Sequence, residues 1–63
     1  MTYSIGGYKV QNVPQYAIDD VETKDYVIVA RYVEDELWFW GCYPERRAEQ
    51  VINYVGGIIC RKI

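Results

Sequence analysis

The sequence predicts one small α+β domain over residues 1–63, in which a single amphipathic helix packs on a sheet of three to four strands. Two neighbouring segments rich in β-branched and aromatic residues predict an antiparallel hairpin, because only a short charged break separates them. A proline followed by apolar residues at helical spacing predicts the helix, and a further apolar segment predicts a closing strand. The expected element order is (β)-β-β-α-β.

The N-terminal segment gives mixed signals. Strand character in residues 3–10 is interrupted by a glycine pair, and residues 12–14 predict a turn that contains a proline. Residues 15–18 fit a short edge strand. The acidic residues that follow fit a loop: Asp19, Asp20 and Glu22. We therefore expect this segment to form either a strand or a lid over the sheet.

The central hairpin is the clearest prediction. Residues 25–33 and 37–43 are both rich in valine, isoleucine and aromatic residues, which favour strands. The charged break between them fits a two-residue loop at either Glu34-Asp35 or Asp35-Glu36, since a gap this short joins antiparallel neighbours.

Residues 44–55 predict the helix. Pro44 suits a helix start, and Glu45 places a negative charge in the first turn, where the helix dipole favours it. Four apolar residues at spacings of i, i+3, i+4 and i+7 form one stripe: Ala48, Val51, Ile52 and Val55. A glycine pair then predicts the helix end. Residues 58–63 predict the closing strand, whose neighbour in the sheet stays open.

Both faces of the expected hairpin are apolar. Strict alternation gives the first face these side chains: Tyr26, Ile28, Ala30, Tyr32, Leu37, Phe39, Gly41 and Tyr43. The side chains expected on the second face are Val27, Val29, Arg31, Val33, Trp38, Trp40 and Cys42. An antiparallel sheet with one solvated face alternates apolar and polar residues, and one helix covers one face only. The other face is therefore expected to need a cover.

A second protein is the expected cover, and a homodimer is the leading interpretation. Tyrosine and tryptophan are favoured at interface centres, and the chain has seven tyrosines and two tryptophans. The expected interface comprises the tryptophans and a row of valines: Trp38, Trp40, Val27, Val29 and Val33. The alternatives are a surface for a different protein only, and a monomeric core filled by the aromatic side chains.

Two further groups of side chains are candidates for contact with a target protein. The N-terminal segment offers tyrosines beside an acidic stretch: Tyr3, Tyr8, Tyr16, Asp19 and Asp20. The polar face of the predicted helix offers Arg46 and Arg47. Desolvated aromatic side chains hold complexes together, and charged rims speed the encounter.

Nucleic-acid binding is the alternative interpretation. Aromatic residues on the second hairpin strand can stack on bases, and Arg46 and Arg47 can neutralise phosphates. The formal net charge of −2 at pH 7 opposes this interpretation, because nucleic-acid binders usually carry a basic excess.

We expect no catalytic residue, metal-ligand set or cofactor. Histidine is absent, so Ser4 and Cys42 lack the usual general base of a nucleophile. The two cysteines, Cys42 and Cys60, make at most half of a tetrahedral zinc site. Apolar runs are too short for a membrane span, and the first residues lack signal-peptide features. The expectation is a cytoplasmic, non-enzymatic protein.

The stretch from Tyr26 to Ile63 resembles small accessory proteins of bacterial phages and other mobile elements. The likeness lies in the strand Glu-Leu-Trp-Phe-Trp-Gly, the following Pro-Glu-Arg-Arg-Ala-Glu-Gln-Val and the terminal Gly-Gly-Ile-Ile. It implies a short protein that acts by binding, such as an inhibitor of a host enzyme or of a host antiviral defence, located in the host cytoplasm. It transfers no site residue.

Overall fold

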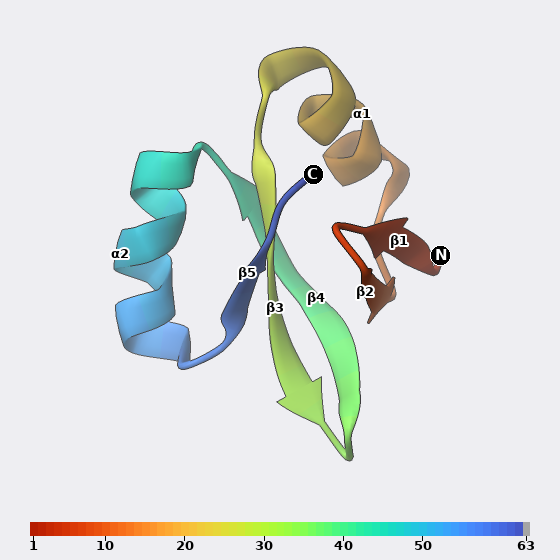
Figure 1. The fold of residues 1–63 in the computed structure, drawn as a ribbon, viewed down its shortest axis with the longest axis vertical. Coiled ribbons are helices and arrows are strands. Elements are labelled where there is room, and N and C mark those ends of the chain that lie inside the picture. The colour runs from red at the N-terminus through yellow and green to blue at the C-terminus, as the bar shows by residue number, and fades with distance from the viewer. Residues whose placement is uncertain (63) are drawn as a thin grey trace.

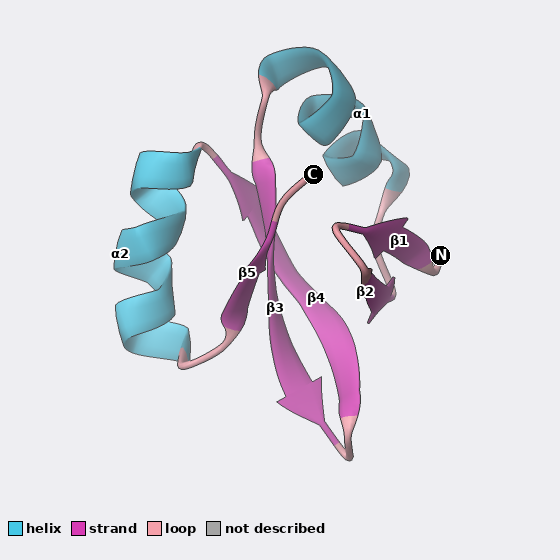
Figure 2. Cartoon of the chain, viewed as in Figure 1, coloured by secondary structure: helices cyan, strands magenta, loops and turns pink. Residues whose placement is uncertain are grey.

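The computed structural model describes residues 1–62 and contains five strands and two helices (Figures 1 and 2). Their bounds, in chain order, are β1 (Tyr3–Ile5), β2 (Tyr8–Gln11), α1 (Gln15–Lys24), β3 (Val27–Val33), β4 (Glu36–Tyr43), α2 (Glu45–Val55) and β5 (Ile58–Cys60). The α+β class is confirmed. The prediction of three to four strands and one helix was too small by one or two strands and by one helix.

The strands form one mixed sheet in the order β1-β2-β4-β3-β5. The hairpin loop is Glu34-Asp35, because Val33 pairs with Glu36 and both loop residues are left-handed, with φ of 50° and 67°. The closing strand, β5, pairs antiparallel with β3 and ends at Cys60. The expected strand over residues 58–63 was therefore too long, and its last residue lies outside the described part of the chain.

Helix α2 packs on one face of the sheet, as the apolar stripe predicted. Ala48 is fully buried against Val27 and Val29 of β3, and Val51 and Ile52 pack against the same cluster. Gly56 ends the helix in a left-handed conformation, and its N–H donates to the Ile52 carbonyl at 2.8 Å.

Helix α1 covers the opposite face, and this was not predicted. Residues 15–18 are not an edge strand, and the acidic residues after them are not in a loop, since both stretches belong to α1. Val13, Ala17 and Val21 are all fully buried in the larger core cluster, together with Ile28 of β3. Their spacing of four residues places them on one side of a helix, which explains why this stretch is helical.

The sheet is strongly curved around the core beneath α1. Gly6, in the turn between β1 and β2, lies directly against the carbonyl group of Arg61, beyond the end of β5. Because β1 and β5 are the two edges of the sheet, this contact brings the opposite edges together. The described structure thus has an inner face closed by α1 and an outer face on which α2 lies (Figure 1).

Candidate functional site

Helix α2 covers only part of the outer face of the sheet. Val27 and Val29 are 4% and 0% exposed beneath it, whereas Val33, further along the same face of β3, is 43% exposed. Trp38 and Trp40 of β4 are 40% and 47% exposed. We call this uncovered group the tryptophan face; its members are Arg31, Val33, Trp38 and Trp40.

Pairing between β3 and β4 assembles the tryptophan face. Arg31 lies opposite Trp38, so the two side chains share a face of the sheet. The Arg31 guanidinium carbon lies 5.6 Å from the centre of the Trp40 ring, which is a cation–π contact. An arginine held over one indole and beside another is a combination typical of interface centres.

A β-bulge at Trp40 changes the expected division of side chains. Ala30 pairs with Phe39 but Val29 pairs with Gly41, so Trp40 is an extra residue in β4. Beyond the bulge the alternation of β4 is shifted by one residue. Cys42 consequently packs in the core beneath α1, and Tyr43 packs beneath α2. Both were expected on the opposite faces, because strict alternation cannot include an inserted residue.

Helix α2 covers some residues of the expected interface and leaves the others accessible. Trp38, Trp40 and Val33 are accessible, but Val27 and Val29 are buried in the monomer. These two valines are corrected to core residues: the apolar stripe of α2 occupies the half of the outer face that they form.

The N-terminal tyrosines have unequal exposure. Tyr3 is half-buried against the inner core, and burial, with a smaller contribution from the Glu22 carboxylate, raises its pKa. Tyr8 and Tyr16 are 41% and 61% exposed. Tyr16 also packs edge-to-face on Phe39, with ring centres 6.5 Å apart. Tyr8 and Tyr16 therefore remain available for contact, whereas much of Tyr3 does not.

The acidic candidates lie on α1. Asp19 is exposed and accepts a hydrogen bond from the Gln15 side chain at 3.1 Å. Asp20 is half-buried and pairs with Lys24 one turn later, at 3.4 Å. Both carboxylates thus have partners on their own helix, although ion pairs of this exposed kind contribute little stability.

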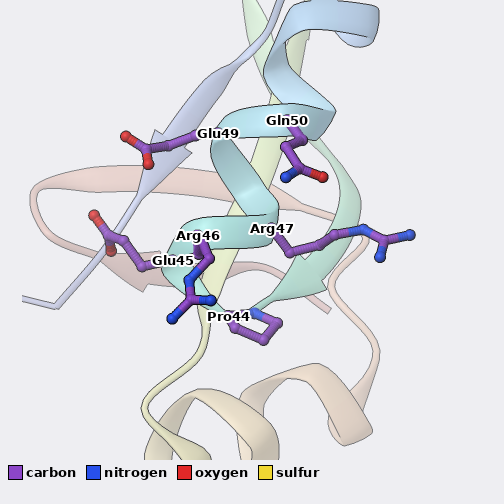
Figure 3. Close-up of a pocket in the computed structure, with 6 residues that line it drawn as sticks. All are labelled: Pro44, Glu45, Arg46, Arg47, Glu49 and Gln50. Atoms are coloured by element: carbon purple, nitrogen blue, oxygen red, sulfur yellow. The ribbon is translucent and has the colours of Figure 1, made fainter.

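The arginine candidates lie away from the tryptophan face. Arg46 and Arg47 are exposed in the first turn of α2, where Figure 3 shows their side chains pointing in different directions around an open hollow. Trp38 precedes this helix by most of the length of β4, about 20 Å of extended chain. This length of β4 separates Trp38 from Arg46 and Arg47.

The two cysteines are free thiols in the inner core. Cys42 and Cys60 both lie opposite Ile28, on its two sides, so two strand spacings, about 10 Å, separate them. That separation is too long for a disulfide without rearrangement. Burial raises the pKa of each thiol to about 11. Within residues 1–62, no group of three or more histidine, cysteine or acidic residues could hold a metal ion.

Sequence reasoning placed Arg31 on the same face as the tryptophans but did not select it as a site residue. Its signal was position: it is the one charged residue inside the otherwise apolar or aromatic β3. Tyr32 and Tyr54, which are both exposed, were also not selected. Isolated exposure of this kind has no sequence signature.

Comparisons with protein-family models, curated protein sequences and solved structures find no match. Neither described helix has the length and apolar character needed to cross a membrane. The candidate site therefore rests on its own geometry: two half-exposed indoles, a stacked arginine and a valine on an uncovered part of the sheet.

Proposed function

We propose that this chain is a non-enzymatic protein-interaction module whose contact surface is the tryptophan face. The observation that carries the proposal is the exposure of Trp38 and Trp40 on the β3–β4 hairpin, beside the part of the sheet that α2 covers. Aromatic side chains that are exposed together on one face of a sheet are typical of binding surfaces.

The size of the exposed indole surface supports a specific contact. The two tryptophans leave roughly 200 Å² of side-chain surface in water, taking about 250 Å² for a whole side chain. Covering that surface contributes up to about 5 kcal/mol at ~25 cal/mol per Å², before the cost of association is subtracted. Such a term is large for a domain of this size, whose total stability is on the order of 3–9 kcal/mol.

The remaining candidates form a second contact region in this proposal. Tyr16 and Asp19 are exposed on α1, at the inner side of the sheet, and Tyr8 is exposed on β2. Resemblance to phage accessory proteins suggests a host protein as the target, with inhibition or modulation as the outcome. Arg46 and Arg47 would contribute charge at a separate end of the molecule.

The chemistry of the thiols supports a non-enzymatic role. A cysteine nucleophile acts as the thiolate, and a pKa of about 11 keeps Cys42 and Cys60 protonated near neutral pH. Both side chains are also directed into the core beneath α1 rather than into a cleft.

The test compares capture by three versions of the protein. Wild type, the double variant Trp38→Ser/Trp40→Ser and the control Tyr54→Ser are immobilised and exposed to lysate of the producing cell, and bound proteins are quantified by mass spectrometry. We expect one protein to be retained by wild type and control and lost from the double variant. Equal capture by all three folded proteins would refute the proposal.

Single-stranded nucleic acid is a second candidate ligand for the same surface. The Arg31–Trp40 stack beside Trp38 supports it, because base stacking on aromatic side chains next to a cation is how sheet surfaces hold single strands. Fluorescence titration with a labelled oligonucleotide at low and high salt decides this point. Binding that weakens steeply with salt and is lost in Arg31→Glu would favour nucleic acid over protein.

A further inference from the structure

We infer that single-stranded nucleic acid binds on the tryptophan face with one base stacked on each indole, while Lys9 and Arg31 hold its phosphates from the two neighbouring strands. This inference rests on the second ligand class proposed for this face, and it assigns the contacts together with two further residues, Lys9 and Gln11. Three observations carry it: the spacing of the indoles, the cations on both sides of them, and the position of the carboxylates.

The spacing of the two indoles selects an extended, unpaired strand. Trp38 and Trp40 lie two residues apart on β4, and both are partly exposed on the outer side of the sheet. Two residues of a strand span about 7 Å, which is twice the rise of about 3.4 Å between stacked bases in a duplex. Neighbouring bases must therefore separate before each can stack on its own indole. A duplex keeps its bases stacked on one another and cannot make this contact.

Lys9 of β2 adds a second cation to this side of the sheet. Strand β2 pairs with β4 so that Val10 lies opposite Leu37, and both of these side chains are buried in the inner core. Lys9 directly precedes Val10, so its side chain points to the outer side, where it is exposed. The outer side therefore carries a positive charge on each of two strands.

These two cations flank the indoles. Arg31 of β3 lies opposite Trp38, and Lys9 lies on β2, at the other side of β4. Within the described residues neither cation has a carboxylate within ion-pair distance, since the two ion pairs found there use Lys24 and Arg61. Both charges are thus available to neutralise phosphates, which is the sequence-independent part of nucleic-acid binding.

Gln11 supplies hydrogen-bond donors beside the indoles. It lies opposite Trp38 on β2, so Gln11, Trp38 and Arg31 form one row across three neighbouring strands. Its amide oxygen accepts a hydrogen bond from the Thr2 hydroxyl at 2.9 Å, which leaves the amide N–H groups to donate to a phosphate or to the edge of a base. The row thus combines a donor, a stacking plane and a cation, as surfaces that hold single strands do.

Carboxylates are few on this side of the sheet. Among the outward-facing residues described for β2, β3 and β4, Glu36 is the one carboxylate, so together with Lys9 and Arg31 it leaves a net charge of +1. Glu36 and the acidic hairpin loop lie beyond Trp38, and the bound strand should extend the other way, from Trp38 toward Trp40. The acidic residues of α1 lie on the opposite face, and salt screens charges over about 8 Å. Local charge therefore favours a phosphate chain here, although the whole chain is acidic.

Fluorescence anisotropy of labelled oligo(dT) and oligo(rU), each of about eight nucleotides, measures the binding directly. We expect wild type to bind both probes with a Kd of roughly 1–100 µM at low salt, and to bind a duplex of the same length about tenfold more weakly or worse. Trp38→Ser and Trp40→Ser should each weaken binding by about tenfold or more, since each removes one stacking plane. The control Tyr54→Ser, at an exposed position on α2, should bind like wild type.

The salt dependence tests the assigned phosphate contacts. For single strands the slope of log Kd against log salt concentration is about 0.7 for each phosphate neutralised, so two cations predict a slope of about 1.4. Lys9→Gln and Arg31→Gln should each lower this slope by about 0.7, whereas the control Lys24→Gln, on α1, should leave it unchanged. Glu36→Gln should tighten binding, because it removes the carboxylate beside Lys9, whereas damage to the fold would weaken binding. Circular dichroism confirms that each variant is folded.

Three outcomes would overturn the inference: no binding of either probe up to about 500 µM protein, equal binding of the duplex, or a salt slope that neither Lys9→Gln nor Arg31→Gln changes. The first outcome is also separable from failure of the proposed function. Absence of oligonucleotide binding with tryptophan-dependent capture of a protein would leave the protein-interaction function standing, and loss of both would reject both.

Discussion

Replacing Gly57 with alanine should disrupt the closing strand. A Cβ on Gly57 would lie far closer than van der Waals contact to the Ala30 carbonyl oxygen, which is backbone and cannot swing away. Relieving the overlap requires β5 and β3 to separate by roughly 1 Å, which weakens a ladder of three paired residues, each hydrogen bond contributing about 1 kcal/mol. We expect Gly57→Ala to lower the free energy of unfolding by about 3 kcal/mol, a large part of the total.

Urea unfolding followed by tryptophan fluorescence and circular dichroism measures this loss. Gly56→Ala is the matched control, because Gly56 is the adjacent glycine and a side-chain methyl group there would meet open space. Its φ of 73° imposes only the strain of a left-handed alanine, about 1 kcal/mol. If Gly57→Ala costs no more than Gly56→Ala, the close approach of β5 to β3 does not limit stability and the reasoning is refuted.

Three further predictions concern the cores and the C-terminal segment. Val21→Ala should lower the free energy of unfolding, measured in urea, by about 2 kcal/mol because Val21 is fully buried. The control Glu22→Ala should lower it by less than about 0.5 kcal/mol. Equal effects would show that α1 does not seal the sheet. Burial raises the pKa of the Cys60 thiol from 9.0 to about 11. Because the thiol ionises in the unfolded chain before it ionises in the folded protein, its contribution to stability should be full below pH 9 and should decrease toward pH 11. Cys60→Ala should therefore show a smaller decrease in urea midpoint between pH 9 and pH 11. Arg61→Gln removes the exposed ion pair with Glu45, whose Nε–Oε2 distance is 3.2 Å, and should leave the urea midpoint nearly unchanged; a clear shift would indicate that the pair holds the C-terminal segment in place.

Local patterns were sufficient to predict part of the fold. The hairpin strands followed from β-branched and aromatic composition, and α2 followed from Pro44 and the spacing of Ala48, Val51, Ile52 and Val55. Helix α1 was missed because its acidic residues were interpreted as a loop. The buried positions Val13, Ala17 and Val21, spaced by four, were the available signal, and Pro14 precedes α1 as Pro44 precedes α2.

The candidate site was predicted less completely than the fold. Exposure of Trp38, Trp40 and Val33 agrees with the expected uncovered face, but Val27 and Val29 were assigned to the same surface because alternation specifies a face and not its cover. The position of α2 along that face depends on the lengths and packing of elements far apart in the chain. Sequence periodicity does not contain that information.

By itself, the sequence determined that both faces of the hairpin are apolar and that one amphipathic helix is too little to cover them. Only the tertiary structure decided the covers: α1 on the inner face, α2 on half of the outer face, and solvent at the tryptophan face. It also decided where the alternation of side chains breaks, at the bulge at Trp40, and that Arg31 stacks on the Trp40 ring. The physical reason is that periodicity arises from the backbone within each element, whereas coverage and register shifts arise from packing between elements.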